Sequence, residues 1–187
     1  MTRYETYYGS PLGEMLLVAD GDALTGVYFS HQKYFPREND VRRDGDELEV
    51  LKRTRQQLDE YFHEGRRVFD LPLSPQGTPF QKLVWAELLR IPFGETRSYG
   101  DLAHALGDVN KSRAVGAANG RNPITIIVPC HRVIGADGTL TGYASGVERK
   151  LALLSLEGAA LPSAHAATTT ATRRTRLSAP ANLAFDF

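Results

Sequence analysis

Three successive residues, Cys130, His131 and Arg132, bring together a thiol, an imidazole and a guanidinium. A thiolate is a nucleophile and a thiol is not, so an activated cysteine needs a neighbouring base or positive charge. Adjacent residues of an extended strand point to opposite faces. His131 therefore reaches the sulfur only if the chain turns there or a water molecule bridges the two groups. A buried cysteine with a purely structural role fits these residues equally well.

Glu157 is the carboxylate that would complete such a site. A relay in which Glu157 orients His131, and His131 takes the proton of Cys130, would follow the logic of a catalytic triad. Glu157 lies near the end of the helix expected over residues 147–158, next to two leucines. Because glutamate is rarely buried unless it is paired, this pattern taken alone favours a surface position.

The composition argues against metal chemistry and against a membrane protein. Cys130 is the only cysteine, and the five histidines are scattered with none three or four positions from another, so we expect no metal site. No apolar run approaches the roughly 18 residues that cross a bilayer. The start of the chain lacks the apolar core of a secretory signal. We therefore expect a metal-free, cofactor-free protein of the cytoplasm.

Charge alone does not point to nucleic acid. The 22 basic and 22 acidic residues balance, whereas a nucleic-acid partner is usually announced by a larger basic excess. The distribution is uneven: residues 1–75 hold 10 Lys and Arg against 14 Asp and Glu, and residues 76–158 hold 9 against 7.

Residues 1–75 read as a scaffold. The segments 4–10, 14–20 and 23–29 read as short strands, the last two joined by a hairpin turn at Asp20-Gly21. Residues 46–65 predict a helix that ends at Gly65. A Pro/Gly/Ser-rich stretch then places a domain boundary near residue 75, and this first part carries no residues that suggest chemistry.

Residues 76–158 are predicted to be mostly helical. Thr78, Pro79 and Gln81 form the capping box of a first helix. Two short helices follow, one from Ser98 to Gly107 and one from Asn110 to Gly120, and such a pair is a helix-turn-helix candidate. The second helix consists almost entirely of small residues, which suits either a close helix–helix contact or a DNA groove.

The last predicted elements flank the cysteine. The apolar run at 124–128 predicts a strand leading to Cys130. The helix expected over 147–158 has Val147, Leu151 and Leu154 on one face. Residues 159–187 are rich in Ala, Thr, Ser and Pro, and we expect a flexible tail.

Five segments between Thr78 and Gly158 resemble the O6-alkylguanine-DNA alkyltransferases (methylated-DNA–protein-cysteine methyltransferases) of the bacterial single-protein type, in content, order and spacing. They are FGETRSYGDLA (93–103), SRAVGAANGRNP (112–123), VPCHRVIG (128–135), TGYASG (141–146) and LEG (156–158). The resemblance implies an α+β fold. A small antiparallel sheet with a helix (ribonuclease H-like) would precede a mainly helical, winged-helix-like domain with a helix-turn-helix.

The resemblance also implies catalytic roles. Cys130 would take the alkyl group from guanine O6, or from thymine O4, and keep it as a thioether in a single turnover. His131 would act as its base through a water molecule, and Glu157 would orient His131. Tyr99 would donate to guanine N3, and Asn122 would link the recognition helix to the active-site strand.

Further residues are implied in binding the damaged base and the duplex. The expected substrate contacts are Val133, Tyr143, Ala144 and Ser145, and Ala144 replaces the serine of some members, which bears on the size of alkyl group accepted. Arg113 would enter the duplex from the minor groove and fill the gap left by the flipped base. The other expected DNA contacts are Ser112, Ala114, Gly116 and Arg121.

The implied partner is double-stranded DNA bearing alkylated bases, bound by a monomer, with cooperative assembly along DNA as a further expectation. No N-terminal zinc site is expected, because no cysteine precedes Cys130. Two other functions remain open: a protein that binds alkyl lesions without transferring the group, and a cysteine hydrolase that uses Cys130, His131 and Glu157.

Overall fold

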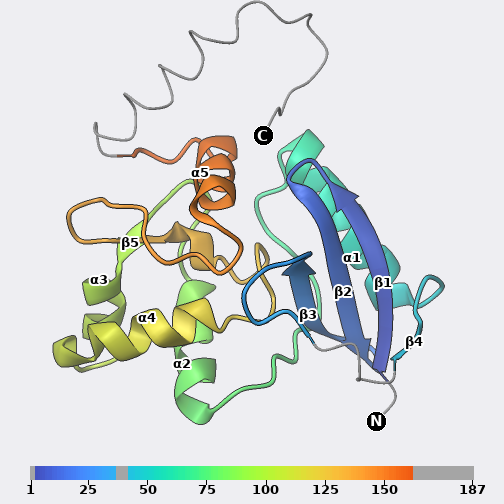
Figure 1. Ribbon diagram of the computed structural model, residues 1–187, viewed down its shortest axis with the longest axis horizontal. Helices are drawn as coiled ribbons and strands as arrows, with labels where there is room; N and C mark the ends of the chain where they lie inside the picture. Colours follow the sequence, from blue (N-terminus) through green and yellow to red (C-terminus); the bar gives the residue numbers. More distant parts are fainter. Residues whose placement is uncertain (1–2, 37–41, 162–187) are drawn as a thin grey trace, which may run out of the picture.

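The computed structural model describes residues 3–36 and 42–161, which form a sheet region (to residue 75) and a helical region (from residue 76) side by side (Figure 1). The sheet has the strand order β3-β2-β1-β4, with strands β1 (Arg3–Ser10), β2 (Gly13–Asp20), β3 (Ala23–Phe29) and β4 (Arg42–Asp44). The three predicted strands are confirmed. The fourth strand was not foreseen, and it runs parallel to β1, so the sheet is mixed rather than purely antiparallel.

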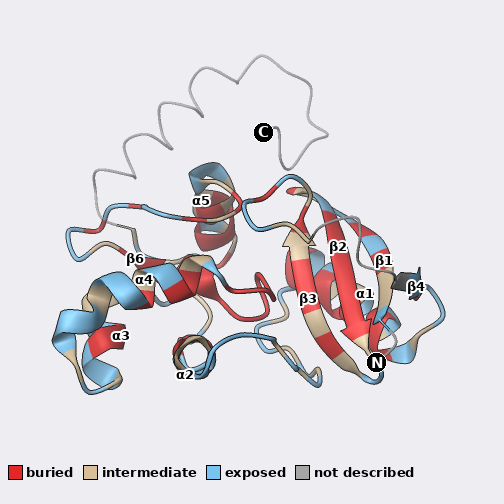
Figure 2. Ribbon diagram, turned by 60° about the horizontal axis from the view of Figure 1, so that its bottom comes forward, coloured by how far each residue is buried: buried red, intermediate tan, exposed pale blue. Residues whose placement is uncertain are grey.

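Burial explains why this sheet forms. Five successive residues of β2, Met15 to Ala19, are buried, as expected for a central strand covered on both faces (Figure 2). The hairpin between β2 and β3 turns at Gly21 and Asp22, one residue later than predicted, and Gly21 has the positive φ of 57° that such turns require.

One long helix packs on the sheet. Helix α1 (Glu49–Asp59) lies against β1, β2 and β3 and continues as a π-helical turn, η1 (Glu60–Glu64). Gly65 ends it in the left-handed conformation, with φ of 77°, as predicted. Residues 66–77 contain no helix or strand, apart from a bridge between Leu73 and Leu24, and the domain boundary at 75 stays a prediction.

The first helix of the helical region begins as predicted. Helix α2 (Pro79–Leu88) has Thr78 as its N-cap, and both hydrogen bonds of the capping box with Gln81 are present. The short strand β5 (Arg97–Ser98) leads into helix α3 (Tyr99–Ala105). Ser98 is the N-cap of this helix, and its side chain accepts a hydrogen bond from the Asp101 backbone N–H.

The helix-turn-helix is present with a different connection. The 3-10 turn η2 (Val109–Lys111) leads into helix α4 (Ser112–Gly120). Asn110 is not the N-cap, because its backbone N–H is bonded to the Asp108 side chain inside η2, and α4 begins after Lys111. The turn is therefore longer than the few residues that sequence suggested.

The remaining elements surround the cysteine. They are the 3-10 turn η3 (Cys130–Arg132), strand β6 (Val133–Ile134), which pairs with β5, and helix α5 (Val147–Leu156). The predicted strand at 124–128 is wrong, because this stretch is irregular. The predicted face of α5 is also partly wrong, since Val147 is 40% exposed while Lys150 is buried.

Two backbone hydrogen bonds join the regions at the edge of the sheet. The Val27 N–H donates to the Pro123 carbonyl at 2.8 Å, and the Thr125 N–H donates to the Val27 carbonyl at 3.0 Å. Edge strand β3 therefore holds the segment that leads to Cys130. No helix within residues 3–36 and 42–161 is long and apolar enough to span a membrane. The predicted tail falls almost wholly on residues 162–187, outside the described residues.

Candidate active site

The chain turns at the cysteine, which answers the question raised by its sequence. Cys130, His131 and Arg132 form the 3-10 turn η3, so the neighbouring side chains are not forced to opposite faces as they would be on a strand. All three residues are buried. The thiol and the imidazole are therefore both enclosed by the protein.

Asn122 shapes the segment before the turn. Its side-chain amide donates to the Val128 carbonyl at 2.7 Å, and its oxygen accepts from the Ile124 backbone N–H at 3.0 Å. Directly after α4, this residue replaces the missing strand hydrogen bonds with its own side chain. Asn122 thus fixes the segment between α4 and Cys130, which is irregular and not the predicted strand.

The backbone is strained at Ile126. This β-branched residue has a φ of 70°, in the left-handed region that such residues rarely adopt, and it is 1% exposed. Strain of this kind is found at active sites when the surrounding structure enforces it. Here Asn122 on one side and the pairing with Val27 on the other provide that constraint.

Cys130 lies beside two hydroxyl groups. Its sulfur is 3.8 Å from the Thr125 hydroxyl, which is 2.9 Å from the hydroxyl of Tyr143. Burial raises the pKa of the Cys130 thiol, and contacts with Asn122 and Thr125 and the charge of Lys150 oppose that rise only in part. The resting group is therefore a thiol, whose proton must leave during any attack.

Glu157 is buried and paired, so the surface position favoured by its pattern is wrong. Five donors reach its carboxylate. His131 Nε2 lies 2.7 Å from Oε1, and the Tyr61 hydroxyl and Arg132 Nη2 lie 2.8 and 2.9 Å from it. Arg132 Nε and the Gly94 N–H donate to Oε2 at 2.8 and 3.2 Å. Burial opposes ionisation, but the bonds from His131 and Arg132 hold the pKa of Glu157 well below its usual range.

His131 is set up as a neutral base. Burial lowers its pKa, and the hydrogen bond and charge of Glu157 offset this only partly. With its Nε2–H directed at Glu157, the neutral ring carries its lone pair on Nδ1. Nδ1 is buried and has no hydrogen-bond partner among the described residues. It is the atom able to accept a proton.

The substrate loop expected at 141–146 closes over this site. Tyr99 at the start of α3 donates from its hydroxyl to the Thr141 carbonyl at 3.2 Å, and its ring lies beside Gly116 of α4. Tyr143 is buried with its hydroxyl at Thr125, as described above. Val133 is buried in β6.

The sheet region holds this loop from the other side. The Lys33 N–H donates to the Ala144 carbonyl at 3.0 Å, and the Ser145 hydroxyl donates to the Gln32 side-chain oxygen at 2.8 Å. Ser145 is buried, and Ala144 is half-buried. The position of the loop therefore depends on residues of both regions.

The residues predicted to contact DNA lie on α4 and at Arg121, directly after this helix. Arg113 and Ala114 are exposed on α4, while Ser112 and Gly116 are half-buried. Arg113 has no ion-pair or hydrogen-bond partner among the residues that the structure describes. Arg121 is exposed and its guanidinium lies 3.8 Å from the centre of the Tyr34 ring, a cation–π contact between the two regions.

Sequence reasoning missed three residues of the site, Tyr61, Thr125 and Lys150, and gave a different role to Arg132. Arg132 seemed a charge for the thiol, but its guanidinium is bound by Glu157 and by the Ile91 carbonyl. Lys150 donates to the Thr141 carbonyl at 3.0 Å, and burial lowers its pKa to about 8. Its place on the apolar face of α5 was a signal that could have been noticed.

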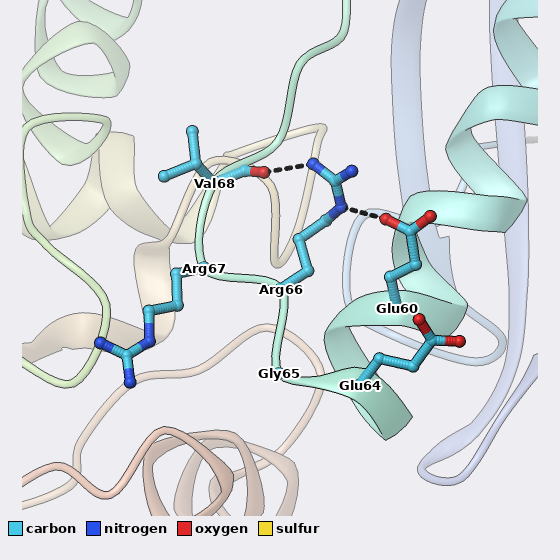
Figure 3. Close-up of a pocket in the computed structure, with 6 residues that line it drawn as sticks. All are labelled: Glu60, Glu64, Gly65, Arg66, Arg67 and Val68. Carbon is cyan, nitrogen blue, oxygen red and sulfur yellow. Dashed lines mark hydrogen bonds and ion pairs between the residues drawn. The ribbon is translucent and has the colours of Figure 1, made fainter.

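A separate hollow of about 460 Å³ lies along η1 and the residues after it (Figure 3). Arg66 in its wall donates to Glu60 and to the Val68 carbonyl, at 2.5 and 2.6 Å. None of the residues lining it belongs to the site around Cys130.

Comparison with known proteins identifies the family of the chain. Two family models match the chain: the ribonuclease-like domain of 6-O-methylguanine DNA methyltransferase over residues 3–75, and the DNA binding domain of the same family over residues 79–159. The methylated-DNA–protein-cysteine methyltransferase of Methanosarcina acetivorans is 48% identical over 83% of this chain and 98% of its own length. The constitutive enzyme of Bacillus subtilis is 46% identical over 82% of this chain and 94% of its own.

Solved structures match as well. The Mycobacterium tuberculosis O6-methylguanine methyltransferase has a TM-score of 0.76 and 43% identity, covering 89% of this chain and 99% of that one. The Mycobacterium tuberculosis OGT in complex with DNA has a TM-score of 0.74 and 44% identity, covering 84% and 93%. With a buried cysteine, histidine and carboxylate at the positions of the family's motifs and both domains matched, the chain belongs to the methylated-DNA–protein-cysteine methyltransferase family.

Proposed function

We propose that this protein repairs DNA by direct reversal of damage, moving an alkyl group from guanine O6, or from thymine O4, to the sulfur of Cys130. The observation that carries the proposal is a buried histidine, next in the chain to the buried Cys130, with one ring nitrogen held and the other unpartnered. The Nε2–H of that histidine is held by Glu157, which leaves Nδ1 as the proton acceptor. The shared family and the DNA complex of a relative supply the substrate class.

The reaction balances as a single displacement. The Cys130 thiol gives its proton to His131 Nδ1, through a water molecule, and the sulfur attacks the alkyl carbon. The S–C bond forms while the C–O6 bond breaks, and the bonding electrons leave with guanine. Glu157 stabilises the imidazolium that results. A thioether has no easy route back, so each protein molecule reacts once.

Tyr99 acts on the leaving guanine, and Asn122 acts on the segment that carries the nucleophile. The guanine that leaves carries negative charge, which a hydroxyl donor neutralises, and we assign that donation at N3 to Tyr99. Asn122 holds the cysteine segment in its irregular shape. We assign the contacts with the alkyl group to Tyr143, Val133, Ala144 and Ser145, and we expect the small Ala144 to leave room for groups larger than methyl.

The damaged nucleotide must leave the duplex before it can reach a buried sulfur, at a cost of roughly a few kcal/mol. We assign the compensating insertion, from the minor groove, to Arg113, which is exposed on α4. The small residues Ser112, Ala114 and Gly116 let the helix approach, and Arg121 meets the backbone beside it.

The reaction suits a monomer in the cytoplasm. One chain supplies the thiol, the base and the carboxylate, and a reactive thiol persists in a reducing compartment. Cooperative assembly along DNA is compatible with this and is tested by the dependence of binding on site length.

Intact-protein mass after incubation with a duplex containing O6-methylguanine tests the proposal. Wild type should gain one methyl group per molecule and stop, and Cys130→Ala should gain none. DNA binding without a gain in mass would instead identify a lesion-binding protein. Repeated turnover of an ester without DNA would identify a cysteine hydrolase.

A further inference from the structure

One residue of the sheet region reaches into the site. Tyr61 is 1% exposed, and its hydroxyl donates to Glu157 Oε1 at 2.8 Å, although 96 positions separate the two residues. Tyr61 lies in the π-helical turn η1, at the end of α1. Single π-helical turns are rare in proteins as a whole, and those that occur are often found at functional sites.

Tyr61 and His131 bind the same oxygen atom. Oε1 accepts from His131, from the Tyr61 hydroxyl and from Arg132 Nη2, whereas Oε2 is held by Arg132 Nε and the Gly94 N–H. Because Arg132 binds both oxygens and the Gly94 N–H binds Oε2, the orientation of the carboxylate does not depend on Tyr61 alone. What the Tyr61 hydroxyl adds is a proton that draws negative charge away from the atom facing His131.

We propose, on the basis of the alkyl-transfer reaction proposed above, that Tyr61 is a positioning residue of the active site. It acts through Glu157 to keep His131 neutral and ready to accept the proton of Cys130. The sheet region thereby contributes to the chemistry as well as to the scaffold.

The charged groups around His131 act on its protonation in opposing directions. Glu157, at the end of α5, favours the imidazolium, whereas Arg132 of η3 and Lys150 of α5 disfavour it. Cys130 adjoins His131 in η3, and Tyr143 and Tyr61 are protonated, since burial raises the pKa of both hydroxyls. By sharing Oε1, Tyr61 weakens the one group that pulls His131 toward its charged form.

The test is Tyr61→Phe, which removes only the hydroxyl and keeps the ring among Phe62, Phe69 and Phe93. Tyr8→Phe is the matched control, because Tyr8 donates to the Asp59 carboxylate at 2.7 Å in the same region, away from Glu157. Single-turnover methyl transfer from an O6-methylguanine duplex is measured against pH. In Tyr61→Phe the acid limb should move up by about half to one pH unit, and in Tyr8→Phe it should stay in place.

Histidine-selective NMR titration of the unreacted protein gives a readout that needs no DNA. The His131 resonances should titrate at higher pH in Tyr61→Phe than in wild type and Tyr8→Phe. An active Tyr61→Phe with the wild-type pH profile and titration would overturn the role of Tyr61 and leave the proposed function standing. A wild-type protein that transfers no methyl group would instead overturn the proposed function.

Discussion

The two regions of the molecule treat buried polar groups in opposite ways. In the described part of the sheet region the buried polar side chains are neutral: Thr6, Gln32, Thr54 and Gln57. In the helical region they include the charged or titratable His131, Arg132, Lys150 and Glu157. Burying charge is costly and adds little stability compared with apolar packing. The comparison indicates that the helical region retains its buried charges for chemistry, whereas the sheet region supplies the stable scaffold and one neutral group, the Tyr61 hydroxyl, to the site.

The largest difference in the free energy of unfolding is expected between two glutamate-to-alanine variants, one in each region. Glu157→Ala leaves the Arg132 guanidinium buried without its carboxylate, so the free energy of unfolding should fall by about 3–5 kcal/mol and methyl transfer should be lost. Glu47→Ala removes only an exposed partner of Lys52, and its effect on urea unfolding should be close to zero. An equal fall in the free energy of unfolding in the two variants would contradict the expected difference between the two regions.

A core substitution in the sheet region should separate stability from chemistry. Leu17 in β2 is fully buried, and Leu17→Ala should lower the free energy of unfolding by about 2–5 kcal/mol. The rate of methyl transfer per folded molecule should stay at the wild-type value. Leu17→Ile, which keeps the volume, serves as the control for packing. A slower rate in fully folded Leu17→Ala would show that the sheet region shapes the site more broadly than through Tyr61 and β3.

Substitution of Arg113 tests whether the exposed face of α4 acts only in extruding the base from the duplex and not in the chemical step. Arg113→Ala should slow methyl transfer from a duplex roughly tenfold or more, because the cost of extrusion is no longer offset. Transfer from the free base O6-methylguanine, which needs no extrusion, should be unchanged. Arg90→Ala removes the same charge from an exposed position on another surface and should leave both rates alone. A parallel loss on duplex and free base would place Arg113 in the chemical step instead.

The smallest effect is the response of stability to acid. Because the pKa of His131 is lowered from 6.5 on folding, the unfolded chain binds more protons below that pH, and stability should decline as the pH falls through 6.5. Glu157 has a depressed pKa, so its contribution is present above 4.5 and is lost below it. Urea unfolding from pH 7 to 4 measures the first decline and the onset of the second. His131→Gln should abolish the first decline, and its persistence in that variant would assign it to another group.

The elements that follow local rules could be predicted from sequence. The capping box at Thr78, the C-cap at Gly65 and the first three strands are set by contacts between near neighbours, and the structure confirms them. Strand β4 was missed because its pairing with β1 joins residues about forty positions apart. No local pattern reports such a pairing.

The site was predictable only in part for the same reason. Family motifs indicated Cys130, His131 and Glu157, and the structure places His131 against Glu157. The apolar run at 124–128 looked like a strand because hydrophobicity records burial and not hydrogen bonding. The side chain of Asn122 replaces the ladder there. Tyr61 was overlooked because its partner lies in the other region, and an aromatic residue on a helix face looks like ordinary core.

Peptide mapping after reaction tests the central claim most directly. The protein is mixed with a slight excess of duplex carrying O6-methylguanine, digested, and the mass of the peptide containing Cys130 is measured. We predict a gain of one methyl group on that cysteine, matched mole for mole by guanine restored in the DNA. Restored guanine with an unmodified Cys130, or a methyl group found on another residue, would contradict the account.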